Sequence, residues 1–139
     1  MKRILFGATF LLAGYGLFAQ ESDLQQIERT LNYYLQGGTN NDFATLEKAF
    51  HPTASMRYIT DAYQDVNAVE FFRKGMKAGP RQNRLTRITS IDVDGHAAQA
   101  RLEIEYETFM FIDYMSLLKI EGEWKIVSKI FYRKIKAEK

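Results

Sequence analysis

The chain has 139 residues, 46% of them hydrophobic, with 19 Lys and Arg against 17 Asp and Glu. A formal net charge of +2 gives no electrostatic basis for nucleic-acid binding, which depends on neutralising phosphates. The sequence contains no cysteine, which excludes disulfides, zinc–thiolate sites and thiol nucleophiles, so a packed core has to stabilise the fold.

Residues 1–19 have the pattern of an export signal. Lys2 and Arg3 form a basic start, and the uncharged apolar run over residues 4–18 is shorter than the roughly 20 residues that span a bilayer. Ala19 suits the position before a cleavage site. The mature chain would lose two basic residues and no acid, so its net charge is near zero and we expect no membrane association. The alternative is an uncleaved membrane anchor.

The mature chain, residues 20–139, reads as one domain that begins with a helix. Ser22 and Gln25 form a capping box, and apolar residues recur at helical spacing over residues 22–36. We expect Gly37-Gly38 to end this helix, since glycine is favoured just past a helix C-terminus.

Two further helices are expected before the strand-rich C-terminal half of the chain. Asn41 or Asp42 can cap a short helix that His51-Pro52 ends, because the residue before proline avoids helical geometry. A first strand follows over residues 54–59. Asn67 and Glu70 then form a capping box for a helix over residues 67–78, which Gly79-Pro80 closes.

Beyond Arg84 the pattern changes to the alternation of strands that are buried on one face. Asp94-Gly95 and Glu121-Gly122 predict hairpin turns, and residues 123–135 predict the last strand. The stretch between these turns is far too long for one strand, so we expect a bend near Thr108–Ile112. Helices first and a meander last indicate an α+β fold, with three N-terminal helices packed on an antiparallel sheet.

This layout resembles the nuclear transport factor 2-like superfamily. The segments IDVDGHAAQA (residues 91–100) and DYMSLLKIEGEWKIVSK (residues 113–129) resemble the bacterial branch catalogued as "putative lumazine-binding", close to the polyketide-cyclase-like group. The resemblance implies a cone-shaped roll whose curved sheet encloses a pocket roofed by the helices, often as a homodimer. Members include steroid isomerases, dehydratases, epoxide hydrolases, cyclases and proteins with no known activity, so the fold does not define the function.

Asp113 and Lys129 are the first candidate pair. A three-residue turn at residues 120–122 would place them directly opposite each other, whereas a two-residue turn would place Lys129 opposite Tyr114. The ion pair could lie in the pocket, on the outer sheet face or at a dimer contact. Because a lysine lowers the pKa of a neighbouring aspartate, Lys129 argues against Asp113 as a general base of the steroid-isomerase type.

His51 is the other acid–base candidate, with a helix-end structural role as the alternative. His96 is expected in an exposed turn, and two isolated histidines predict no metal site. No cofactor is predicted. Tyrosines could line the pocket beside Lys129 and hydrogen-bond a flat, partly polar ligand, although a single tyrosine is more often a core or rim residue; they are Tyr33, Tyr34, Tyr58, Tyr63, Tyr106 and Tyr114.

Two more segments carry expectations. Arg81, Arg84 and Arg87 are interpreted as a solvated strand edge, with an anion-binding edge as the alternative. The apolar tip over residues 109–111 is expected to be covered by the pocket mouth or by a partner subunit.

The leading hypothesis is an exported protein that binds a small molecule, forms a homodimer and carries no complete acid–base set. The alternatives are an isomerase, dehydratase or cyclase that uses Asp113 or His51, and a structural homodimer whose pocket is filled by its own side chains.

Overall fold

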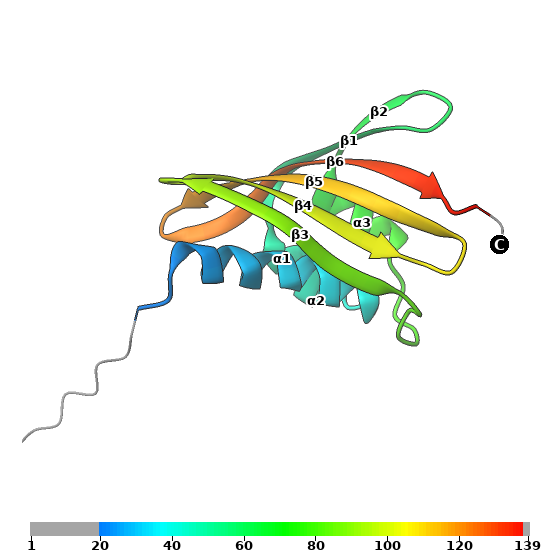
Figure 1. The fold of residues 1–139 in the computed structure, drawn as a ribbon, viewed down its shortest axis with the longest axis horizontal. Helices are drawn as coiled ribbons and strands as arrows, with labels where there is room; N and C mark the ends of the chain where they lie inside the picture. Colours follow the sequence, from blue (N-terminus) through cyan, green and yellow to red (C-terminus); the bar gives the residue numbers. More distant parts are fainter. Residues whose placement is uncertain (1–19, 138–139) are drawn as a thin grey trace, which may run out of the picture.

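The computed structural model describes residues 20–137, so the predicted export signal over residues 1–19 lies outside the described residues. The helices are α1 (Asp23–Thr39), α2 (Phe43–Leu46), the 3-10 turn η1 (Glu47–Ala49) and α3 (Ala68–Gly75). The strands are β1 (Phe50–Ile59), β2 (Tyr63–Asn67), β3 (Leu85–Asp94), β4 (Ala97–Glu105), β5 (Phe109–Ile120) and β6 (Glu123–Ile135), as Figure 1 shows.

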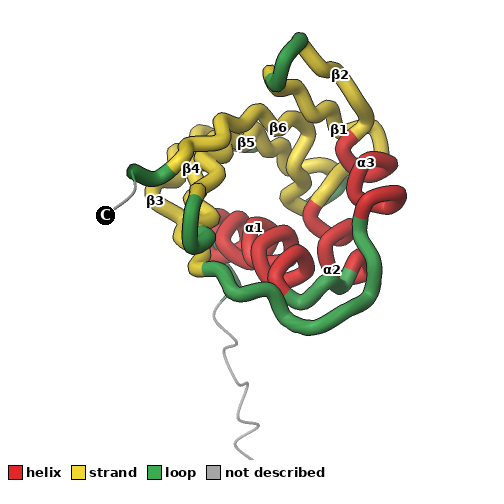
Figure 2. Tube along the Cα trace, turned by 90° about the vertical axis from the view of Figure 1, so that its right-hand side faces the viewer, coloured by secondary structure: helices red, strands yellow, loops and turns green. Residues whose placement is uncertain are grey.

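The six strands form one sheet in the order β2-β1-β6-β5-β4-β3. Strands β1 and β6 run parallel, and every other neighbouring pair is antiparallel. The sheet curls over the helices, which lie against its concave side (Figure 2). The predicted α+β fold of three helices on a curved, mainly antiparallel sheet is therefore confirmed. Within residues 20–137, no helix has the length and apolarity needed to cross a membrane.

The first helix begins as predicted but ends later. Ser22 caps α1, and the capping box with Gln25 is formed. Gly37-Gly38 do not end the helix, which continues to Thr39. Both glycines are buried, and a Cβ on Gly37 would lie 2.5 Å from the backbone nitrogen of Leu46. Gly37 therefore allows close packing on α2, and Gly38 makes room for the Arg84 side chain, which is a different use from helix termination.

The second and third helices are shorter than predicted. Asp42 caps α2, but the strand β1 starts at Phe50, so His51-Pro52 lie inside a strand. The proline is tolerated there because the pairing of β1 with β6 is interrupted between Phe50 and Ser55, where no ladder hydrogen bond is required. Asn67 caps α3, which ends at Gly75 rather than at residue 78. The short strand β2 was not predicted.

The long C-terminal stretch reverses in a hairpin instead of bending. Strand β4 ends at Glu105 and β5 begins at Phe109, so the reversal lies just before the predicted bend. In the first predicted hairpin, Asp94 pairs with Ala97 and the loop is Gly95-His96. In the last hairpin, Glu121 and Gly122 both have positive φ, of 50° and 83°, as a two-residue type I′ turn requires.

Candidate functional site

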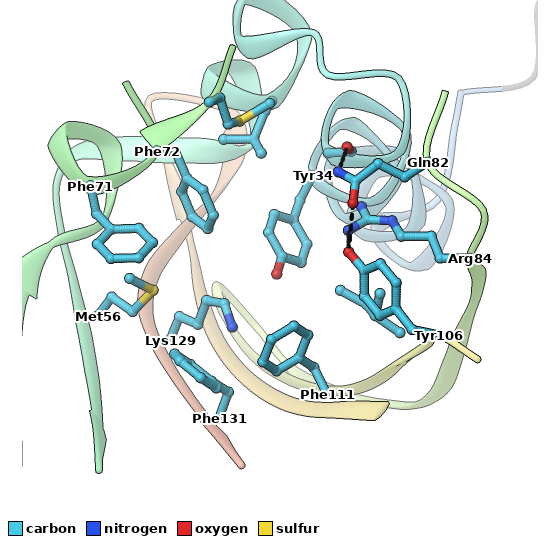
Figure 3. A pocket seen from close by; sticks show the side chains of 14 residues that line it. Tyr34, Met56, Phe71, Phe72, Gln82, Arg84, Tyr106, Phe111, Lys129 and Phe131 are labelled. Carbon is cyan, nitrogen blue, oxygen red and sulfur yellow. Dashed lines mark hydrogen bonds between the residues drawn. The ribbon is translucent and has the colours of Figure 1, made fainter. Parts of the chain in front are cut away.

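A cavity of about 250 Å³ lies between the helices and the concave face of the sheet (Figure 3). Its apolar side chains are Leu46, Met56, Phe71, Phe72, Met76, Ile104, Phe111 and Phe131. Its polar and charged side chains are Tyr34, Gln82, Arg84, Tyr106 and Lys129. The expected pocket is thus present and open, which counts against a hollow filled by the protein's own side chains.

A buried charged group forms one part of the cavity wall. Asp113 is fully buried; its Oδ1 accepts a hydrogen bond from Lys129 Nζ at 2.7 Å, and its Oδ2 accepts one from the Tyr34 hydroxyl at 2.7 Å. Lys129 Nζ lies 4.2 Å from the centroid of the Phe131 ring, a cation–π contact. Asp113 therefore lies behind Lys129 and Tyr34, and these two side chains, not the carboxylate, line the cavity.

Burial shifts the proton equilibria of this group. Desolvation lowers the pKa of Lys129, and the nearby charge of Asp113 opposes that shift. Desolvation raises the pKa of Tyr34 well above its usual value, and Asp113 raises it further. Tyr34 is consequently a hydrogen-bond donor at neutral pH. Both carboxylate oxygens of Asp113 are occupied, so Asp113 neutralises Lys129 and positions Tyr34.

The ion pair forms through a strand register that neither sequence alternative contained. The turn has two residues, but the pairing of β5 with β6 shifts between Ser116 and Leu117. After this irregularity Lys129 pairs with Met115, and Asp113 pairs with Phe131. Both predicted registers are therefore wrong. The ion pair still forms because Asp113 and Lys129 are diagonal neighbours on the same inner face of the sheet.

A second polar group lies around Arg84 on the wall where α1 meets β3. The Arg84 guanidinium donates to Thr39 Oγ1 at 2.8 Å, to the Tyr106 hydroxyl at 3.0 Å and to the Leu35 carbonyl at 3.0 Å. The Tyr106 hydroxyl donates to Gln82 Oε1 at 2.8 Å. The interpretation of Arg84 as part of a solvated edge is wrong, since its acceptors on α1 draw it inward.

The neighbouring arginines behave as the edge interpretation expected. Arg81 is exposed. Arg87 is paired with Glu103 and Glu105 across the outer surface. No local pattern in the sequence separates Arg84 from these two, so sequence reasoning missed Arg84 and Gln82 as lining residues.

The predicted site residues do not all meet at the cavity. Tyr34, Tyr106 and Lys129 line it. Tyr58 stands beside it, with its ring stacked on Phe131 at a centroid distance of 4.7 Å.

The remaining candidates lie elsewhere. Tyr33 lines a separate polar groove beside Lys48 and Trp124, Tyr114 is 48% exposed, and Tyr63 is exposed on β2. His51 lies on β1 with its Nδ1 2.8 Å from the Thr53 hydroxyl, so neither the cavity nor a helix end includes it. Among residues 20–137, no cluster of histidine and carboxylate side chains could hold a metal ion.

The pocket mouth covers Phe109 and Phe111 of the apolar tip, as expected. Phe111 lines the cavity, and Phe109 stacks on Tyr106 at a centroid distance of 4.6 Å. The tip thus joins the aromatic wall to the polar group around Arg84.

Several solved structures have the same fold. An NTF2-like protein of unknown function from Shewanella baltica OS155 is 27% identical, with a TM-score of 0.72 over 82% of this chain and 98% of that chain. One from Methylobacillus flagellatus KT is 30% identical, with a TM-score of 0.72 over 86% and 97% of the two chains. A ketosteroid isomerase-like protein from Erwinia carotovora atroseptica SCRI1043 is 13% identical and shares the fold, with a TM-score of 0.64 over 82% and 98%. None of the curated proteins matches this chain.

Family assignment rests on both sequence and fold. Residues 22–132 match the model of the family described as "Putative lumazine-binding". The matched segment runs from the cap of α1 into β6 and so includes both polar groups of the cavity wall. The chain therefore belongs to the putative lumazine-binding family, with the nuclear transport factor 2-like fold.

Proposed function

We propose that this protein is an exported binding protein that holds a small, flat, largely apolar molecule in the cavity under the sheet. The observation that carries the proposal is an open, aromatic-walled cavity of about 250 Å³ with a few fixed polar groups. Pockets of this composition, apolar with sparse polar groups, are typical of small-molecule sites. The family description names lumazine, a bicyclic heteroaromatic compound that is small and flat like this class but more polar.

Binding is better supported than an isomerase, dehydratase or cyclase reaction. Asp113 has no exposed surface, and both of its oxygens accept hydrogen bonds from Tyr34 and Lys129. A general base has to reach the proton that it removes, at about 2.6–3.2 Å or through one water molecule. The other acid–base candidate, His51, lies outside the cavity.

Isothermal titration with lumazine and with 2-naphthamide tests the proposal. We expect saturable binding of at least one of these flat bicyclic probes. Met76→Trp, which adds bulk at a half-buried lining position after α3, should weaken that binding about tenfold, or ~1.4 kcal/mol. Tyr63→Trp is the matched control, because Tyr63 is exposed on β2 and lies outside the lining. Equal weakening by both variants, or absence of binding by both probes and also by the related acid 2-naphthoate, would contradict the proposal.

Export and dimerisation complete the proposed function. The export pattern of residues 1–19 supports a mature protein that begins at Gln20, and the intact mass of protein recovered outside the cytoplasm checks this. The homodimer is supported by exposed apolar side chains on the outer sheet face; these are Tyr114, Leu118, Ile130 and Tyr132.

A further inference from the structure

The charge balance of the cavity wall identifies which molecules it should accept. Two cationic side chains, Lys129 and Arg84, line the cavity, and none of its lining residues is acidic. Asp113 lies directly behind Lys129 and pairs with it at 2.7 Å, so this half of the wall carries no net charge. Any net charge that the cavity presents to a ligand must therefore come from Arg84.

Among the described residues, Arg84 has no acidic partner. Its three hydrogen bonds go to a threonine hydroxyl, a tyrosine hydroxyl and a backbone carbonyl, all of them uncharged. None of the ion pairs formed within residues 20–137 includes Arg84. A guanidinium carries further N–H donors beyond these three bonds. The C-terminus of α1 offsets only a fraction of the charge, equivalent to about half an elementary charge for a helix end.

The guanidinium is held in a fixed orientation. The Tyr106 proton is used in the hydrogen bond to Gln82, so the Tyr106 oxygen is left to accept from Arg84. Gln82 in turn donates to the Gly38 carbonyl at 2.8 Å and to Asn41 Oδ1 at 3.2 Å. Figure 3 shows Arg84, Tyr106 and Gln82 together on one side of the cavity, across from Lys129. A cation held in this way does not have to be reorganised when an anion binds.

We infer that the cavity selects a flat, apolar monocarboxylic acid whose carboxylate is bound by Arg84, an inference that rests on the proposed binding function. A single uncompensated positive charge suits a monoanion better than a dianionic phosphate, and a planar carboxylate matches the guanidinium fork. Phe111, Phe131 and Phe72 provide aromatic surface for the apolar part of the ligand. The volume is just below the ~300–1,000 Å³ typical of drug-sized sites, which favours one or two rings.

The test compares 2-naphthoate with 2-naphthamide, which has nearly the same shape and no charge. Isothermal titration at neutral pH should give an affinity for the acid about tenfold or more above that for the amide, since a charged hydrogen bond is worth more than a neutral one. Equal affinities, or tighter binding of the amide, would overturn the inference.

Variants assign the preference to Arg84. In Arg84→Gln the ratio of acid to amide affinity should fall to about one, whereas Arg81→Gln, which removes the same charge from an exposed position, should keep the wild-type ratio. Arg84→Lys retains the charge and should keep an intermediate ratio, which provides a readout if the glutamine variant does not fold. If Arg84 only stabilises the end of α1, its replacement will change the stability of the protein but leave the ratio of acid to amide affinity unaltered.

The outcomes separate this inference from the proposed function. Binding of the amide without any preference for the acid would leave the binding function intact and remove the anion site. If lumazine, 2-naphthamide and 2-naphthoate all fail to bind, both the proposed binding function and the anion site are ruled out. A preference for the acid that persists in Arg84→Gln would place the anion elsewhere and overturn the assignment to Arg84.

Discussion

Asp113 joins three elements through one carboxylate. It lies on β5, accepts a hydrogen bond from Lys129 on β6 and accepts another from Tyr34 on α1. The carboxylate is fully buried and Lys129 is 3% exposed, so neither charge is stabilised by bulk water. Each charge consequently depends on the other, because an unpaired buried charge is strongly destabilising.

Replacing one member of the Asp113–Lys129 pair should lower the free energy of unfolding more than replacing both members. Lys129→Met should lower the free energy of unfolding by about 3–5 kcal/mol, because it leaves the carboxylate buried and unpaired. The double variant Asp113→Asn/Lys129→Met should recover a large part of that loss. Urea denaturation measures both values. Lys134→Met, at an exposed position on the same strand, is the control and should change stability by less than about 0.5 kcal/mol. Additive losses in the double variant would argue against coupling.

Tyr34 should make the fold sensitive to alkaline pH. Its pKa is raised by burial and by Asp113, whereas a tyrosine in the unfolded chain ionises near pH 10. Above about pH 10 the folded state therefore holds a proton that the unfolded state releases, and stability falls. Tyr34→Phe should be less stable than wild type at neutral pH, and the difference should narrow above about pH 10. Urea titrations across this pH range measure the difference in unfolding free energy between the two proteins. Lys129 is present in both, so its own titration contributes to both curves. A difference that stays constant with pH would contradict the assignment to Tyr34.

At the scale of elements, the contact between α1 and α2 depends on a missing side chain. Gly37 lies in the last turn of α1, and a Cβ there would lie 2.5 Å from the backbone nitrogen and 2.7 Å from the Cα of Leu46. Those atoms belong to the backbone of α2 and cannot move aside as a flexible side chain could. The close approach positions the end of α1, where Thr39 and the Leu35 carbonyl bind Arg84.

Gly37→Ala should therefore destabilise the protein, by about 1–3 kcal/mol as overpacked cores do. Helix propensity alone predicts the opposite sign, a gain of roughly 0.5–1 kcal/mol. Gly75→Ala is the matched control, since Gly75 also lies in a helix but has no atom within 4 Å of the added Cβ, and it should be neutral or stabilising. Thermal unfolding of the two variants measures the change in stability. If both substitutions stabilise the protein, the α1–α2 contact can relax to accept the added methyl group.

The sheet organises the whole molecule through its two faces. The inner face carries Asp113 and Lys129 and closes the cavity, whereas the outer face carries Tyr114 and Ile130, which pair across β5 and β6 and are about half exposed. Exposed apolar side chains that adjoin on one sheet face commonly mark an interaction surface. We expect a second copy of this chain to cover it, as proposed above.

Ile130→Glu should convert the dimer to a monomer, because a charged side chain at the centre of an apolar interface has no partner there. Sedimentation velocity over a range of concentrations measures the change. Leu24→Glu is the control; Leu24 is 45% exposed on α1, which lies on the opposite, concave side of the sheet. If the wild-type protein is a monomer, the proposed dimer is wrong, but the proposals on the cavity and its ligand preference are unaffected.

Local patterns were sufficient for several features of this protein. The α+β class, the N-cap of α1 at Ser22, the cap of α2 at Asn41 or Asp42 and a turn at Glu121-Gly122 could all be predicted, because caps and tight turns depend on residues adjacent in the chain. The same hairpin brings the strands of Asp113 and Lys129 side by side, although the register that places the two side chains together was not predicted.

Contacts between distant segments set the rest. The irregularity beside Leu117 changed the register, the backbone of α2 gave Gly37 its role, and the Leu35 carbonyl drew Arg84 inward while Arg81 stayed exposed. Each of these depends on which groups the folded chain brings within a few ångströms, and that proximity has no counterpart in sequence spacing. The shape and the charge of the cavity therefore depend on the tertiary structure, which places α1 beside β3.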